Sequence, residues 1–228
     1  MKSGPLYKIE AQDGGSSREI TIDVTRSASS FPVLGEGLRK VLGTVLRDTR
    51  LGIKDVVEFG AGKLKNVPFI LEMGKNVCAV EFEELNSNPI AQSNYTICRG
   101  YDGHFRRLDP EEFVKDSQKF DLALIINVIP TMPIASERDA ALKLLNHKLR
   151  NGKFALWFAL KGDDVYKERQ ELDKTCLDGV WLGEGKHLQT FYKNYTVDDV
   201  MSLMHNAGFM PFNRFHVETN HALLFRKG

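Results

Sequence analysis

Residues Asp55–Glu81, DVVEFGAGKLKNVPFILEMGKNVCAVE, decide the fold of this chain. The stretch predicts four elements in succession: a strand over Asp55–Phe59, a tight turn at Gly60-Ala61-Gly62, a helix over Leu64–Met73, and a second strand over Asn76–Val80 that ends at Glu81. Glycine tolerates the backbone angles of such a turn, and it lets a ligand lie against bare main chain. The pattern therefore predicts a βαβ unit with a nucleoside-sized crevice above its first strand.

The spacing of the glycines distinguishes between the two nucleoside cofactors that use this arrangement. A dinucleotide needs G-x-G-x-x-G, because its pyrophosphate rests on the helix N-terminus and the third glycine permits close packing. Lys65 occupies that third position, so a dinucleotide site is not predicted. S-adenosylmethionine carries no phosphate and needs only open backbone and an acid that accepts both ribose hydroxyls. Glu81 stands at the right distance from Gly62 to be that acid.

The segment Glu58-Phe59-Gly60-Ala61-Gly62 resembles motif I, E/DxGxGxG, of the class I S-adenosylmethionine-dependent methyltransferases. Leu64 departs from the motif, because a third glycine is common there. Two later passages, LRNGKFALWFAL and YTVDDVMSLMHNAGF, are similar to the same family, so the resemblance covers residues 37–228. It implies S-adenosylmethionine as the cofactor, bound by Glu58, Gly60, Ala61, Gly62, Glu81 and Phe82. The alternative is an α/β domain with a glycine turn and no cofactor.

The resemblance implies an α/β, Rossmann-like fold: a seven-stranded, mostly parallel sheet with helices on both faces and a C-terminal antiparallel hairpin. The apolar run Phe120–Ile126 predicts a buried parallel strand, and Phe209–Val217 with His221–Phe225 predicts the final hairpin. Leu6–Ala11 and Glu19–Thr25 alternate apolar with polar residues and predict an N-terminal β-hairpin. We expect a hairpin extension and loop over 1–34 and a methyltransferase domain over 35–228.

Two surface features leave the partners of the chain open. The edge of the N-terminal hairpin needs a partner or a cover, so the hairpin is a lid, a packed flap or the contact of a homodimer. Gly37–Arg50 predicts an amphipathic helix whose outer face carries Arg39, Lys40, Arg47 and Arg50. That basic face is either a solvated surface or a docking face for DNA or RNA.

The remaining cofactor residues are expected where the next strands end. A short third strand is predicted at Tyr95–Cys98, and the resemblance then places Asp102 where an acid accepts a hydrogen bond from the adenine amino group, with Gly103 and His104 beside the ring. Asn127 and Val128 follow the strand Phe120–Ile126 at the floor of the crevice. Asp102 is otherwise an acidic loop residue, and Asn127 a cap at the end of a strand.

The side chains around the methyl acceptor are the least determined. Methyl transfer depends mainly on alignment of donor and acceptor, and a general base is needed only if the acceptor loses a proton. His187 precedes the last helix and is the candidate base, with an exposed loop histidine as the alternative. Tyr192 and His104 are candidates for the acceptor pocket. Phe31 and Pro32 are candidate lid residues over the cofactor.

Composition excludes several other classes of protein. The 228 residues carry a net charge of +1, so there is no overall electrostatic attraction to nucleic acid. Three cysteines without metal-ligand spacing predict reduced thiols and no metal, and no signal peptide or membrane span is predicted. We expect a cytoplasmic enzyme that methylates an O or N atom of a small molecule. The alternatives are a methyltransferase of nucleic acid and an inactive, methyltransferase-like partner subunit.

Overall fold

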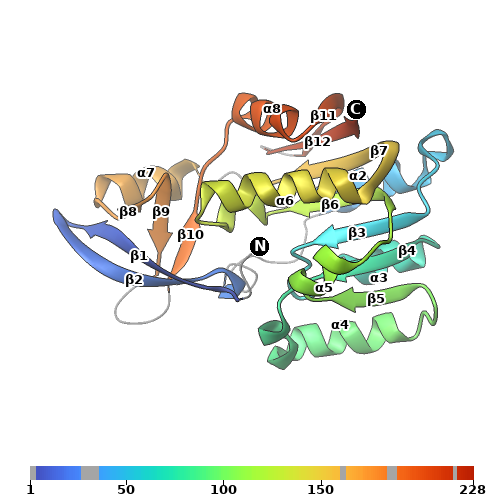
Figure 1. Ribbon diagram of the computed structural model, residues 1–228, viewed down its shortest axis with the longest axis horizontal. Coiled ribbons are helices and arrows are strands. Elements are labelled where there is room, and N and C mark those ends of the chain that lie inside the picture. Colours follow the sequence, from blue (N-terminus) through green and yellow to red (C-terminus); the bar gives the residue numbers. More distant parts are fainter. Residues whose placement is uncertain (1–3, 27–35, 160–162, 184–188, 218–219) are drawn as a thin grey trace.

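The largest unit of the protein is a seven-stranded sheet (Figure 1), seen in a computed structural model that describes residues 4–26, 36–159, 163–183, 189–217 and 220–228. Its strand order is β11-β12-β7-β6-β3-β4-β5. The strands are β3 (Asp55–Phe59), β4 (Asn76–Val80), β5 (Phe105–Leu108), β6 (Phe120–Ile126), β7 (Leu149–Phe158), β11 (Phe209–Val217) and β12 (Asn220–Lys227). The five strands from β7 to β5 are parallel, and β12 is antiparallel to both of its neighbours. The predicted fold class is therefore confirmed.

Helices cover both faces of this sheet. One face carries α2 (Glu36–Arg47), α3 (Val67–Glu72) and α4 (Pro89–Arg99), and the other carries α5 (Pro110–Lys115), α6 (Ala135–Lys148) and α8 (Val197–Asn206). Alternate residues of a strand point to opposite faces, so Val56 of β3 joins the first apolar core and Val57 joins the second. None of the helices that the structure describes is long and apolar enough to cross a membrane.

The third parallel strand lies later in the chain than the sequence predicted. Tyr95–Cys98 belongs to α4 instead, because the side chain of Asn88 caps that helix and Pro89 occupies its first position. The strand is β5, and it ends where Asp109 opens α5 with a capping box. Strand β5 contains two arginines and lacks the apolar run that identifies β6.

One helix start also differs from the prediction. Helix α3 begins at Val67 rather than at Leu64, because Leu64 has a left-handed backbone (φ 58°) that a right-handed helix excludes. Helix α6 begins at Ala135 and has no side-chain cap, whereas α8 begins after Thr196, which forms a capping box with Asp199.

The N-terminal hairpin packs against a segment from a distant part of the chain. The hairpin consists of β1 (Leu6–Asp13) and β2 (Ser16–Asp23), and the segment contains α7 (Asp163–Glu171), β8 (Thr175–Cys176), β9 (Gly179–Leu182) and β10 (Thr190–Tyr192). Together they bury a third apolar core made of Tyr7, Ile9, Ala11, Ile20, Ile22, Cys176, Trp181 and Phe191. We call this unit, residues 4–26, 163–183 and 189–193, the cap. The domain boundary predicted between residues 34 and 35 stays a prediction.

The hairpin has intramolecular partners along its length. The main chain of Gln189 accepts a hydrogen bond from Asp23 (2.8 Å) and donates one to Thr21 (2.9 Å), so it pairs with the edge of β2. At the other end, the N–H of Gly15 donates to the carboxylate of Asp173 (2.8 Å). One edge of the hairpin is thus covered by its own chain, whereas a homodimer through the hairpin stays a prediction.

The cap is attached to the main sheet through the first turn of α6. Arg138 is only 2% exposed; its guanidinium donates to the carbonyl oxygens of Met132 (2.8 Å) and Pro133 (3.2 Å) and pairs with Asp178 of the cap. The hydroxyl of Tyr7 donates to Glu137 (2.6 Å). These contacts hold the cap near the carboxyl end of β6, on the side toward which the β3 arrow points in Figure 1.

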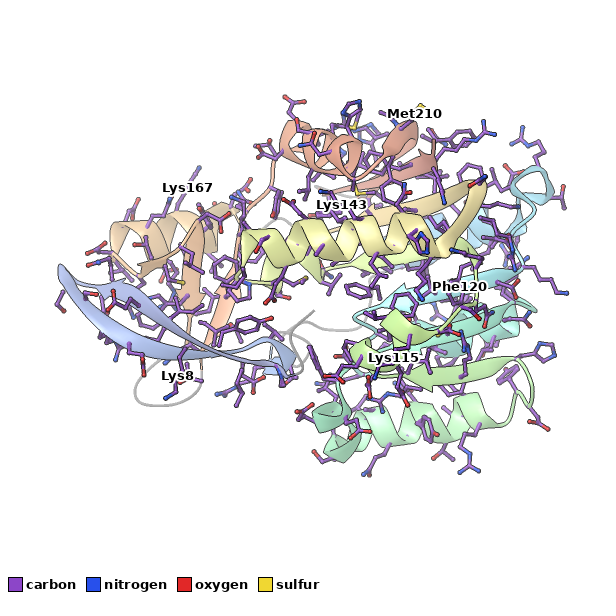
Figure 2. All side chains as sticks on the ribbon, viewed as in Figure 1. Lys8, Lys115, Phe120, Lys143, Lys167 and Met210 are labelled. Atoms are coloured by element: carbon purple, nitrogen blue, oxygen red, sulfur yellow. The ribbon has the colours of Figure 1, made fainter. Side chains whose placement is uncertain are left out.

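Arg138→Met should destabilise the protein, because it leaves the carbonyls of Met132 and Pro133 without this donor and leaves Asp178 with Lys193 alone (3.1 Å). We expect a loss of about 3 kcal/mol in the free energy of unfolding, measured by urea denaturation. Lys143→Met is the matched control, since Lys143 is exposed on the same helix (Figure 2), and its effect should stay within about 0.5 kcal/mol. Equal effects of the two substitutions would contradict this role of Arg138.

Candidate functional site

The glycine turn after β3 is held against the end of β4. The amides of Gly60 and Ala61 both donate to the carbonyl of Val80, at 3.0 and 3.1 Å. Gly60 and Gly62 have positive φ angles of 69° and 55°, which side chains other than glycine rarely adopt. The sequence therefore places glycine where this turn requires it.

Val128 lies directly against the bare backbone of Gly60. A Cβ atom added to Gly60 would stand 2.4 Å from a methyl group of Val128, which is closer than any van der Waals contact. The glycine was expected to make room for a ligand, but at this position it makes room for a protein side chain. The turn that follows β3 is thereby packed against the segment that follows β6.

Leu64 replaces the third glycine of the motif and keeps the backbone conformation of a glycine. Its φ of 58° costs about 1–2 kcal/mol for a residue with a side chain. The side chain is fully buried in the first apolar core, which contributes about 1.5–3 kcal/mol and offsets that cost. Burial of the Leu64 side chain therefore makes a left-handed backbone tolerable at this position of the turn.

Glu81 joins the end of β4 to the glycine turn. One carboxylate oxygen accepts the amide hydrogen of Gly62 (2.6 Å) and the other accepts that of Phe82 (2.8 Å). Burial raises the pKa of Glu81, while these two backbone bonds and the nearby Arg107 oppose the rise. A carboxylate has about four acceptor positions, so two remain for the hydroxyl groups of a sugar.

A second buried carboxyl group lies beside the start of α3. Glu58, on β3, is 2% exposed, and one of its oxygens accepts a hydrogen bond from the amide of Asn66. Its other oxygen, Oε2, has no hydrogen-bond partner among the described residues, and neither has Oδ1 of Asn66. Burial raises the pKa of Glu58 to about 8, Asn66 counteracts the rise, and the charge of Glu81 adds to it.

Three residues predicted for the cofactor or acceptor lie at the opposite edge of the sheet. Asp102, Gly103 and His104 precede β5 instead of following a strand, and His104 hydrogen-bonds the side chain of Asn76 (2.7 Å) at the start of β4. Gly103 and His104 line a cavity of about 150 Å³ there. They do not follow the third strand as expected, because that strand was assigned too early in the chain, and their binding roles stay predictions.

Asp109 occupies the position that was predicted for Asp102. It follows β5 at the carboxyl edge of the sheet, and its side chain accepts the amide hydrogen of Glu112 (2.8 Å) at the start of α5. The signal in the sequence was Asp-Pro-Glu-Glu, which is typical of a helix start. Reading that signal would have assigned the preceding four residues to the strand.

The remaining predicted residues divide between the sheet and the cap. Asn127 and Val128 follow β6 as expected, and Asn127 has a left-handed φ of 55° with its amide donating to Phe158 (2.8 Å). Tyr192 lies in the cap, 8% exposed, in an edge-to-face contact with Tyr166 (6.4 Å between centroids). The candidate base His187 and the candidate lid residues 31 and 32 lie outside the described residues. The structure thus brings Glu58, Gly60–Gly62, Glu81, Phe82, Asn127 and Val128 to one edge.

The basic residues of and beside α2 make contacts within the chain. Lys40 pairs with Glu36 (2.9 Å) and Arg50 with Asp48 (2.7 Å). Arg39 stacks over Phe69 and Arg47 reaches the sulfur of Met73, at 5.1 and 3.8 Å respectively. These contacts fit a solvated surface, and nucleic-acid binding by this face stays a prediction.

Comparison with solved structures identifies the fold. A 1,6-didemethyltoxoflavin-N1-methyltransferase from Burkholderia thailandensis is 18% identical (TM-score 0.58; 87% of this chain and 92% of that one). An S-adenosylmethionine-dependent methyltransferase from Methanosarcina mazei is 14% identical (TM-score 0.61; 86% and 99%). An O-methyltransferase family protein from Burkholderia thailandensis is 9% identical (TM-score 0.57; 83% of this chain), and the chain spans only 56% of its length.

No family model and no curated protein sequence matches the chain. Similarity at these identities establishes the fold and leaves activity to be argued from the site. The chain has the fold of the class I S-adenosylmethionine-dependent methyltransferases.

Gly60→Ala should destabilise the protein, because the new methyl group overlaps Val128 and the residue keeps a left-handed φ. We expect a loss of about 2–4 kcal/mol by chemical denaturation. In a Val128→Ala background the overlap is relieved, so the same substitution should cost at least about 1 kcal/mol less. If the two substitutions have strictly additive effects on the free energy of unfolding, the steric overlap with Val128 does not contribute to the cost of Gly60→Ala.

Proposed function

We propose that this protein transfers a methyl group from S-adenosylmethionine to an O or N atom of a small molecule. The observation that carries the proposal is the junction of Glu81 with the glycine turn at the carboxyl edge of the sheet. In open α/β sheets, ligands bind outside the carboxyl ends of the strands, where the strand order reverses. Here the order reverses between β3 and β6, beside this junction.

The residues present fit the cofactor. Glu81 has acceptor positions left for the ribose hydroxyls, and Asp109 stands where the family has its adenine-recognising acid. The unpartnered oxygen of Glu58 suits the positively charged amino-acid end of the molecule. When bound, S-adenosylmethionine supplies a methyl group activated by positive sulfur. The protein then contributes mainly the alignment of the acceptor, which is worth up to about 7–11 kcal/mol.

The cap supports a small acceptor. It stands at the carboxyl end of β6, where it contributes Tyr192. Two structural neighbours are described as methyltransferases of 1,6-didemethyltoxoflavin and of magnesium protoporphyrin IX, which are both small molecules. We therefore assign acceptor binding to the side of the crevice that Asn127 and the cap form, with His187 as the base if the acceptor must lose a proton.

Calorimetric titration tests the proposal directly. The protein should bind S-adenosylmethionine and S-adenosylhomocysteine, and it should not bind NADH. If the protein binds neither S-adenosylmethionine nor S-adenosylhomocysteine, or if it prefers NADH, the proposed function is overturned.

Glu81→Ala should weaken S-adenosylhomocysteine binding by about 5- to 150-fold, or about 1–3 kcal/mol, because the ribose loses its acceptor. Glu84→Ala is the matched control, since Glu84 is an exposed acid three residues further along the chain. Both variants should first be shown to be folded by circular dichroism. Unchanged affinity in a folded Glu81→Ala protein would move the ribose contact elsewhere.

A further inference from the structure

The cavity of about 150 Å³ lies at the amino edge of the sheet, where β4, β5 and β6 begin. Parallel strands have all their carboxyl ends on one side, so this edge is opposite to the one where Glu81 meets the glycine turn. In Figure 1 it is the side from which the β3 arrow points away. The proposed contacts to the cofactor and to the acceptor therefore do not use this cavity.

The buried part of the cavity wall is apolar. Cys78 of β4 and Phe120 of β6 line it, are each 1% exposed, and belong to the second apolar core. Burial raises the pKa of the Cys78 thiol to about 12, so at neutral pH this residue is an uncharged group of apolar character. Because an apolar cavity of similar volume takes up benzene, the space suits an apolar body of about six to eight non-hydrogen atoms.

A permanent cation stands beside this apolar wall. Arg106 of β5 is half-buried, and its guanidinium lies over the ring of Phe120, 5.9 Å from the centroid. One terminal nitrogen of the guanidinium pairs with Asp116. No other oxygen of the described residues accepts a hydrogen bond from it. A guanidinium has five N–H donors, so several remain for a ligand.

The charges around Arg106 favour an anion. The hydrogen bond from Arg106 lowers the pKa of Asp116, and the charge of Lys148 adds to the lowering. The ammonium group of Lys148 also donates to the main-chain carbonyl of Asp116. One negative charge therefore stands between two positive ones. None of the described residues that line the cavity is itself an acid.

The exposed rim of the cavity is fixed to the sheet by a chain of polar contacts. The side-chain amide nitrogen of Asn76 donates to Asp55 (2.7 Å), so its oxygen accepts from Nδ1 of His104 (2.7 Å). Asp55 is held in turn by Arg150 at the start of β7 (2.8 Å). The rim thus belongs to the same rigid element as the buried wall.

We propose that this cavity is a binding site for a small carboxylate whose apolar body is about the size of a benzene ring. The body packs against Cys78 and Phe120, and the carboxylate pairs with the guanidinium nitrogens of Arg106 that Asp116 leaves available. Guanidinium and carboxylate groups match each other in shape and charge. Gln118, which also lines the cavity, offers a neutral amide beside them. The inference does not depend on the proposed function, since the two sites lie at opposite edges of the sheet.

Benzoate is the probe, and its binding is followed by ¹H–¹⁵N NMR of the labelled protein. The amides of residues 76–78 and 103–106 should shift in a saturable manner, with a dissociation constant of about 1 mM or less. Benzamide has the same ring without the charge and should bind about tenfold more weakly. The proposal is overturned if these amides do not respond to benzoate, if the shifts scatter over the surface, or if benzamide binds equally well.

Arg106→Met combined with Asp116→Asn removes both charges of the pair, so that no carboxylate is left without its partner. Benzoate should bind this double variant about tenfold more weakly. Lys115→Met is the matched control, since Lys115 is an exposed cation on α5 (Figure 2), and it should leave benzoate binding unchanged. If the double variant does not fold, Arg106→Lys replaces it and should weaken binding about fivefold, because lysine lacks the planar fork. Unchanged affinity in the folded variant would contradict the proposal.

Saturation with S-adenosylhomocysteine separates this site from the crevice at the other edge. Benzoate should bind equally tightly with and without it. If S-adenosylhomocysteine displaces benzoate, the probe occupies the crevice and the proposal is overturned. If S-adenosylhomocysteine does not bind, the proposed function fails, whereas saturable shifts at residues 76–78 and 103–106 still support the carboxylate site.

Discussion

The carboxylate of Glu81 is the constraint on which the rest of the site depends. It accepts amide hydrogens from Gly62 and from Phe82, and so it joins the end of β4 to the turn that leaves β3. The same turn is tied to β4 by the two amides that donate to Val80. Neighbouring strands of a parallel sheet are linked only by long connections, so bonds across their carboxyl ends fix the geometry of any ligand site there. The left-handed Leu64 and the contact of Gly60 with Val128 both follow from the path that these bonds impose.

The cap is held on the sheet domain by polar side chains of α6. A helix of the sheet domain, α6, reaches into the cap through Glu137 and the buried Arg138, while Asp178 and Tyr7 reach back from the cap. A buried guanidinium is retained where several acceptors converge on it, as two carbonyls and a carboxylate do here. The cap is therefore joined to the sheet domain through polar contacts that include the segment after Asn127.

Short-range signals in the sequence predicted the centre of the fold correctly. The strand, turn and acid of Asp55–Glu81 were readable because each element has its own local pattern, and the capping box of Thr196 is equally local. A strand was wrongly predicted at Tyr95–Cys98 because β-branched and aromatic residues favour strands. The segment is helical, and the side chain of Asn88 caps the start of that helix. Because of that single error, Asp102, Gly103 and His104 were expected after a strand, whereas they precede β5. The pairing of Glu58 with Asn66 and the partners of the hairpin depend on tertiary packing, which no local pattern encodes.

The two-part construction of the cap has a consequence for the order in which the protein folds. The indole of Trp181 donates to the main chain of Gln12, which lies 169 positions earlier. During synthesis the hairpin leaves the ribosome long before β8 to β10 are made. Ile9, Ile20 and Ile22 therefore cannot yet pack into the apolar core that they form in the folded protein. Loop closure over such a separation is slow, and the last step of folding is expected to be the docking of the hairpin onto the strands β8 to β10. A nascent chain that stops before the cap is complete would display an apolar, half-paired ribbon of the kind that molecular chaperones bind.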